Sequence, residues 1–415
     1  MDWGHRYSSG VRGLEIPEPE EDFAADPVEL FFDLAYVFAF SQLVALILHD
    51  ATWHGIGEAG LLLLLLWLPW SQFTWSANAV SGNSRRARVL FLLATTASVP
   101  MAASITTALG AGGLLFALPL AAIFLLALAM MVLSLPSDSN VRRSALRYAA
   151  PSACAMALIV LGAFFHGDAR VVIWIAGALT FIGATLVAGT GEWIVRTGHF
   201  AERHGLIIII ALGEVIVALG NSVVIPLAND EGVPGATVAT LIGAGILAGL
   251  LWWSYFDRVQ PALEHRAERF TGVELGRYVR DVYTYAHFPL VAGIVLTAVA
   301  LETVTLHPTE PLSLTYRMIG AGGFALFFGG SGIAVYRAFG VVANERVVAV
   351  AVIVAIAFLF ADVDAIVLFV AVDVVLFAAL AVEHLRIERP GSTQPDEVPT
   401  KPSADDRHVG NERPA

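Results

Sequence analysis

The sequence is poor in charge and nearly free of cysteine. Only 14% of its 415 residues are charged, roughly half the share found in soluble domains. Its single cysteine, Cys154, excludes an intrachain disulfide and a zinc site built from cysteines. The nucleotide-binding pattern GxxxxGK[ST], a GxGxxG pattern that follows a strand, and the nucleophile pattern GxSxG are also missing. These absences argue against ATP-driven or nucleotide-dependent chemistry and against a soluble catalytic domain.

Apolar residues make up most of the chain instead. They account for 57% of the sequence, and the mean hydropathy is +0.71. A transmembrane helix needs about 20 apolar residues, and the chain contains many runs of that length. We therefore predict an all-α polytopic membrane protein that lies in the lipid bilayer. The start of the chain is polar and acidic, so we expect no cleavable signal peptide.

The apolar runs predict about twelve transmembrane helices. Their expected ranges are 28–48, 56–76, 87–109, 112–134, 145–165, 169–190, 205–225, 236–256, 281–302, 318–339, 344–361 and 363–384. With twelve spans, nearly all arginines fall on one side of the membrane, and only Arg170 and Arg317 fall on the other. By the positive-inside rule, both termini are then cytoplasmic.

Three matches suggest that the twelve spans form two parallel six-helix repeats. The stretch "ELFFDLAYVFAFSQLVAL" from Glu29 aligns without gaps on "ERHGLIIIIALGEVIVAL" from Glu202. "WSQF" (70–73) in the second span matches "WSYF" (253–256) in the eighth, and Pro100 and Pro289 interrupt the third and ninth spans. Parallel repeats are a transporter architecture, with the site between the halves. The predicted regions are an N-terminal cytoplasmic segment 1–27, a first half 28–190, a second half 191–384 and a disordered cytoplasmic tail 385–415.

Ionisable residues inside spans are candidates for function because a charge within the bilayer is costly. The stretch "DPVE" from Asp26 is a helix-start pattern, so Glu29 is either a capping residue or part of a site. Asp33 lies one turn deeper, on the helix face that it shares with Glu29, Tyr36 and Phe40. Because no cap needs Asp33, we expect it to point into the bundle.

The seventh span contains Glu214 near the middle of the membrane, about 15 Å into its helix. Asn221 faces the same way, and Gly213 and Gly220 are expected to form a strip for close helix packing. Two interpretations of Glu214 stay open. It handles a proton or a cation, or it is a neutral group that packs by hydrogen bonding to a neighbouring helix.

Polar residues also mark the ends of several spans. Glu202 and His204, with His199 and Arg203, are expected at the cytoplasmic end of the seventh span, where interfacial ion pairs explain them. A metal site from His199, Glu202 and His204 lacks any recognised zinc spacing, so we expect no metal. Asp257 directly follows the eighth span. It is either a site residue or an ordinary charged residue at the membrane interface.

A polar notch is predicted beside His287, two residues before Pro289. Proline cannot donate a backbone hydrogen bond, so it frees a carbonyl one turn earlier. Tyr283 and Tyr285 lie in the same stretch. By contrast, the six leucines 61–66 are interpreted as lipid-facing, and five tryptophans as an interfacial belt. These are Trp67, Trp70, Trp75, Trp252 and Trp253.

Four of these stretches resemble the low temperature requirement A (LtrA) family of bacterial membrane proteins. They are "VELFFDLAYVFAFSQL" (28–43), "GHFAERHGLIIIIALGEVIVALG" (198–220), "WWSYFD" (252–257) and "YAHFPLVAGIV" (285–295). The resemblance covers about residues 25–385. It implies a multi-pass protein of the bacterial inner membrane with a link to growth in the cold, and it supplies no biochemical activity or cofactor. Similar proteins tend to carry an acidic residue after the second span, where this chain has only Asn78 and Asn83.

Three functions fit these observations. A secondary transporter or ion-conducting protein would use Asp33, Glu214 and His287, and would take a small solute or an ion as its partner. An intramembrane enzyme acting on lipids, or a metal or haem protein, would use residues near the cytoplasmic interface: Glu202, His204, Asp257 and His287. A membrane scaffold would have structural charges only. We favour the transporter over an enzyme, and the scattered acidic residues behind the formal charge of −12 give no sign of a nucleic-acid partner.

Overall fold

The computed structural model describes residues 24–80, 84–135, 140–188, 191–228 and 232–387. The predicted N-terminal segment and C-terminal tail fall largely outside these ranges. The described residues are helical apart from loops and one isolated β-bridge between Pro311 and Asp364. The α-helices are α1 (Pro27–His49), α2 (Trp53–Ala77), α3 (Arg85–Ala103), α4 (Gly113–Ser134), α5 (Asn140–Gly162), α6 (Asp168–Ala188), α7 (Thr197–Ala228), α8 (Gly235–Ser254), α9 (Gln260–Ala267), α10 (Gly272–Val279), α11 (His287–Leu306), α12 (Leu314–Phe339), α13 (Asn344–Leu359) and α14 (Ala365–Ile387).

Ten helical segments in the described part of the chain are long and apolar enough to cross a membrane. Each of the twelve predicted spans coincides with a helix, but 87–109 and 344–361 are not among these ten. The corresponding α3 begins with three arginines, and α13 has only 16 residues. The number of twelve spans is therefore not confirmed by length and composition.

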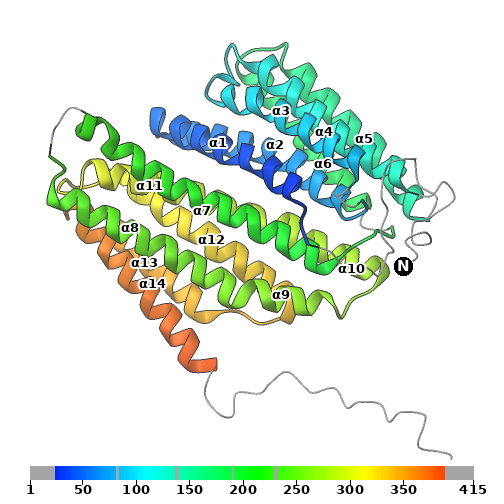
Figure 1. Cartoon of the computed structure of the whole chain (residues 1–415). Coiled ribbons are helices and arrows are strands. Elements are labelled where there is room, and N and C mark those ends of the chain that lie inside the picture. The colour runs from blue at the N-terminus through cyan, green and yellow to red at the C-terminus, as the bar shows by residue number, and fades with distance from the viewer. Residues whose placement is uncertain (1–23, 81–83, 136–139, 189–190, 229–231, 388–415) are drawn as a thin grey trace, which may run out of the picture.

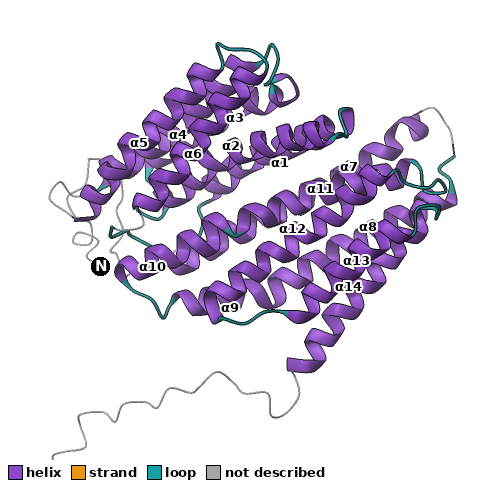
Figure 2. Ribbon diagram, turned by 180° about the vertical axis from the view of Figure 1, so that it is seen from behind, coloured by secondary structure: helices purple, strands orange, loops and turns teal. Residues whose placement is uncertain are grey.

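The helices form two groups, α1–α6 and α7–α14, which meet along α1 and α7 (Figure 1). In the first group α1 packs on α3, α3 on α4, and α5 on α6. In the second group α7 packs on α11, α11 on α12, and α13 on α14. Figure 2 shows the same division from behind. Helices α2 and α11 also touch, so four helices from both groups surround the boundary.

Two π-helical turns interrupt long helices of the second group. They are η2 (Tyr255–Val259), between α8 and α9, and η3 (Arg280–Tyr285), between α10 and α11. A proline follows each turn, Pro261 and Pro289 respectively. Because proline cannot donate to the carbonyl four residues earlier, an α-helix is disfavoured there and the turn widens. The polar notch predicted before Pro289 is the turn η3.

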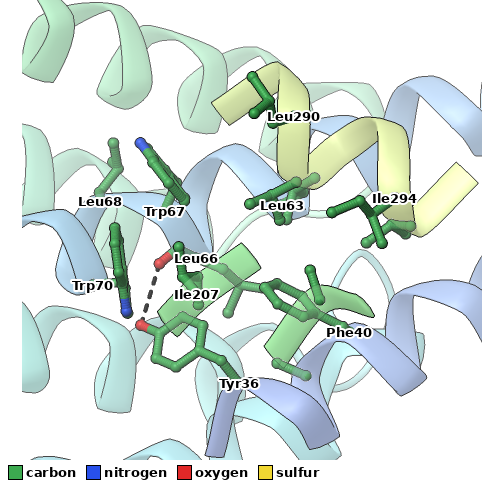
Figure 3. Close-up of a cluster of buried hydrophobic side chains, with 14 of the residues drawn as sticks. Tyr36, Phe40, Leu63, Leu66, Trp67, Leu68, Trp70, Ile207, Leu290 and Ile294 are labelled. Atoms are coloured by element: carbon green, nitrogen blue, oxygen red, sulfur yellow. Dashed lines mark hydrogen bonds between the residues drawn. The ribbon is translucent and has the colours of Figure 1, made fainter. Parts of the chain in front are cut away.

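The core at the boundary consists of side chains from α1, α2, α7 and α11 (Figure 3). The Tyr36 hydroxyl donates to the Leu66 carbonyl oxygen at 3.2 Å across it. Four of the six leucines 61–66 are buried, as are Trp67 and Trp70. Their interpretation as lipid-facing and as interfacial was therefore wrong, because α2 is enclosed by α1, α4 and α11. Trp252 and Trp253 are exposed, as expected for a belt.

The glycine strip expected on α7 was also wrong. A Cβ atom added to Gly213 or Gly220 would meet no atom of another element within 4 Å. The closest helix approach involving glycines occurs instead between α11 and α12. There, a Cβ on Gly293 would lie 2.5 Å from the Gly323 carbonyl oxygen.

Candidate functional site

Six ionisable side chains are completely buried where α1, α2, α7 and α11 meet. They are Glu29 and Asp33 of α1, His199, Arg203 and His204 of α7, and His287 of α11, each at most 1% exposed. We call these six, together with their neighbours Asn78, Tyr255 and Tyr283, the polar cluster. Helix α7 begins eight residues earlier than predicted, which places Arg203 and His204 inside the helix and not at its end.

Asp33 and Arg203 form the central ion pair of the polar cluster. Arg203 donates from both terminal nitrogens to the two Asp33 carboxylate oxygens, at 2.6 and 2.7 Å. The Trp70 indole nitrogen donates to Asp33 at 2.9 Å, and the guanidinium lies 5.9 Å from the Trp70 ring centre. Asp33 points into the bundle, as predicted. Two-point pairing of this kind is strong and fixes the orientation of both groups.

Glu29 has the capping role that the sequence predicted as one of two alternatives. Its carboxylate accepts from the Asp26 backbone nitrogen at 3.2 Å, and the Asp26 side chain in turn caps α1. The same carboxylate lies 3.1 Å from His199 Nε2 and 3.5 Å from Arg203 Nε. Glu29 is therefore a capping residue and also part of the buried charge network.

Hydrogen bonds orient the ring of His199. The Arg196 backbone nitrogen donates to Asn78 Oδ1 at 2.9 Å, which turns the Asn78 amide nitrogen toward His199 Nδ1 at 3.1 Å. Nδ1 must then accept, so the ring proton is on Nε2 and is donated to Glu29.

Within the described part of the chain, the permanent charges of the polar cluster do not balance. Glu29 and Asp33 are two carboxylates, and Arg203 supplies one permanent positive charge. Among the described residues, no other arginine or lysine lies within ion-pair distance of either carboxylate. An uncompensated charge away from water is costly, so this site favours one additional positive charge.

His204 lies beside this network with one ring nitrogen unoccupied. Its Nδ1 donates to the Phe200 carbonyl oxygen at 2.9 Å, while Nε2 is buried and has no hydrogen-bond partner among the described residues. The ring is surrounded by aromatic groups. Its centre lies 5.1 Å from Trp70, 5.0 Å from Tyr283 and 5.1 Å from His287, and it stacks on Phe200 at 5.7 Å.

His287 is held in the same way but is fully bonded. Its Nδ1 donates to the Val282 carbonyl oxygen at 2.9 Å, and its Nε2 accepts from the Tyr255 hydroxyl at 2.6 Å. Tyr255 comes from η2 and Tyr283 from η3. Both π-helical turns thus contribute a tyrosine to the polar cluster, and such turns occur often at functional sites.

Glu214 forms a second polar contact on the same pair of helices. Its carboxyl group is buried and bonds to the Ser41 hydroxyl of α1, and Glu302 of α11 is within its electrostatic reach. Glu214 follows Arg203 by eleven residues, or about 16 Å along α7. It therefore lies apart from the polar cluster, whereas Asp33 and His287 belong to it.

The remaining predicted candidates lie elsewhere. Glu202 accepts from the Ala25 backbone nitrogen at 2.7 Å, Asp257 pairs with its neighbour Arg258 at 3.2 Å, and Tyr285 bonds to the Thr185 hydroxyl. The Asn221 side chain is outside the described residues. The residues proposed for an intramembrane enzyme are therefore not assembled: His204 and His287 meet, and Glu202 and Asp257 contact other groups. In the described ranges, no three His, Cys, Asp or Glu side chains are grouped as metal ligands.

Comparison with known proteins identifies the family. A family model described as "Bacterial low temperature requirement A protein (LtrA)" matches residues 24–381. The chain belongs to the LtrA family. It is 28% identical over 313 residues to an uncharacterized protein of Rhizobium meliloti (strain 1021), which covers 73% of this chain and 75% of that protein. No solved structure matches.

Two charged residues of the polar cluster in this LtrA protein, and Trp70 beside them, were not selected as site residues from the sequence. Arg203 and His199 were assigned to interfacial ion pairs, and Trp70 to an interfacial belt. A signal was present: Glu29 and Asp33 are four residues apart on α1, and His199 and Arg203 are four apart on α7. Residues four apart lie on the same side of a helix. An acidic pair on one helix can therefore contact a basic pair on the neighbouring helix.

Proposed function

We propose that this LtrA protein is a secondary transporter or ion-conducting protein that binds a proton or another monovalent cation in the polar cluster. The charge imbalance carries the proposal, because two buried carboxylates share a single guanidinium. Ionisable groups inside a membrane bundle characteristically mark ion pathways and proton relays. Glu214 and Ser41 would form a second polar station on the same helix pair.

The location of the polar cluster supports a transport role. It lies between the two helix groups, and each of the interrupted segments η2 and η3 contributes one tyrosine to it. Interrupted helices at the boundary between repeats form the sites of many secondary transporters. A scaffold with structural charges would need neither the interruptions nor the unbalanced charge.

Two observations support an internal repeat. In the gapless alignment of α1 on α7, Ser41 corresponds to Glu214, and these two side chains contact each other. Contact between equivalent positions is expected where a two-fold axis passes between two copies. The packing of α1 on α3 also corresponds to that of α7 on α11. We further propose that both termini are cytoplasmic, that the membrane is the bacterial inner membrane, and that the activity contributes to growth at low temperature.

Flux through reconstituted protein tests the proposal. Proteoliposomes with the wild-type chain should show pH- or cation-dependent flux when gradients of H⁺, Na⁺ or K⁺ are imposed one at a time. Asp33→Asn should lower that flux at least about tenfold, which corresponds to about 1.4 kcal/mol of lost stabilisation. Asp257→Asn removes a carboxylate outside the polar cluster and serves as the matched control, with flux near wild type.

Two results would contradict the transport role or favour a scaffold. Wild-type vesicles without flux of any of the three cations would contradict a transport role. Normal cold growth of strains carrying Asp33→Asn or Glu214→Gln would favour the scaffold.

A further inference from the structure

The acceptor atoms of the polar cluster differ in the hydrogen bonds that they accept. The Asp33 carboxylate takes three hydrogen bonds, two from Arg203 and one from Trp70. Glu29 accepts from a backbone nitrogen and from His199. His199 Nδ1 and His287 Nε2 each have a donor as well, from Asn78 and Tyr255 respectively. His204 Nε2 is the basic atom left without one, and a buried unsatisfied acceptor calls for an explanation.

The groups around His204 act on a positive charge of its ring in both directions. Phe200 stacks on the ring, and Trp70 and Tyr283 lie close to it. The face of an aromatic ring attracts a cation within about 6 Å. Trp70 contacts both the Asp33 carboxylate and the His204 ring. Arg203 and His199 of α7 and His287 of α11 oppose a positive charge on His204, and Arg203 is itself paired with Glu29 and Asp33. His287 and Tyr255, from α11 and η2, are uncharged in their observed bonding.

The same surroundings suit a metal cation poorly. Hard cations need several oxygen ligands in place of their hydration shell. The atoms around His204 are mostly ring carbons, and the nearest carboxylate oxygens already accept hydrogen bonds from Arg203 and Trp70. One nitrogen lone pair with aromatic neighbours can take up a proton but cannot replace a hydration shell.

We infer that His204 is the proton-binding residue of this protein and that the ion it handles is the proton. This inference rests on the proposed function and names its ion. A hydronium ion transfers its proton to the Nε2 lone pair, which forms an N–H bond and leaves a water molecule. The ring becomes an imidazolium and keeps its Nδ1 bond to Phe200, and the net charge of the polar cluster rises by one. The reverse transfer to water releases the proton.

The experiment compares His204→Asn with His265→Asn in proteoliposomes that contain a pH-sensitive dye. The asparagine amide can still donate to the Phe200 carbonyl oxygen, but it cannot take up a proton. His265 is an exposed histidine of α9 that pairs with Glu268, outside the polar cluster. We expect His204→Asn to lower proton flux at least about tenfold and to abolish its dependence on pH between 5 and 9. His265→Asn should retain both the rate and the pH profile.

A second measurement keeps the inference testable should His204→Asn fail to fold. Wild-type protein with ¹⁵N-labelled histidine rings should contain one buried ring that changes from one to two protonated nitrogens during the same titration. If no buried ring gains a proton, the inference is overturned. Sodium or potassium flux that moves no protons and persists in His204→Asn would also overturn it, while the transport function would stand. Wild-type vesicles that carry no flux at all would overturn both.

Discussion

At the scale of single residues, the site depends on one arginine held between two carboxylates. The sequence predicted that Asp33 faces inward and that Glu29 shares its helix face, because the spacing of three and four residues defines one face. It did not predict Arg203 as their partner. An arginine near the end of an apolar run is ordinarily an interfacial residue, and only the earlier start of α7 places its guanidinium inside the bundle.

Replacement of this arginine should therefore destabilise the fold strongly. Arg203→Gln leaves Glu29 and Asp33 buried without a counter-charge, and we expect the free energy of unfolding to fall by about 3–5 kcal/mol. The thermal unfolding midpoint in detergent measures this change. Arg337→Gln is the matched control, since Arg337 pairs with Asp281 at a partly exposed position and should change stability by less than about 1 kcal/mol. Equal midpoints for the two variants would disprove the buried pairing.

At the scale of helices, the sequence located the elements better than their contacts. Pro289 predicted an interruption before α11, because proline lacks a backbone donor, and η3 occurs there. The face of α2 was assigned to lipid because a run of leucines is apolar on every side, so periodicity cannot distinguish lipid from protein as its neighbour. The prediction of a close-packing strip from the glycines of α7 failed for a related reason. A glycine permits close packing but does not show that another helix lies against it.

The approach of α11 to α12 gives a matched test on adjacent glycines. A Cβ on Gly323 would lie 2.7 Å from Thr297 Oγ1 and 2.8 Å from the Gly293 carbonyl oxygen, whereas a Cβ on Gly322 would meet nothing within 4 Å. Gly323→Ala should lower stability by about 1–3 kcal/mol through overpacking. Gly322→Ala should leave the unfolding midpoint unchanged or raise it slightly. A smaller effect at Gly323 than at Gly322 would show that the two helices are not in contact there.

At the scale of the whole molecule, hydropathy predicted the order of the helices but left the number of membrane crossings open. Any even number of crossings places both termini on the same side of the membrane. The sides on which the termini lie therefore cannot distinguish ten crossings from twelve. The uncertainty concerns α3 and α13, which are either short or begin with arginines. The loops around α13 differ in charge, however. Arg337 and Arg346 flank the loop before it, and Asp362 and Asp364 lie in the loop after it, a pattern that favours opposite sides of the membrane.

Single cysteines on either side of α13 decide its path. Replacing the one natural cysteine, Cys154→Ser, gives a background without thiols. In that background, Ala361→Cys should react with a membrane-impermeant maleimide added to intact spheroplasts, and Val342→Cys should react only after the membrane is opened, since both loops are exposed. This outcome requires α13 to cross the bilayer with only 16 residues, about 24 Å of helix, which is short of the usual 30 Å core and implies local thinning of the membrane. Reaction of both cysteines from the same side would place α13 outside the set of crossings, and the arginine distribution would then have to be explained without it.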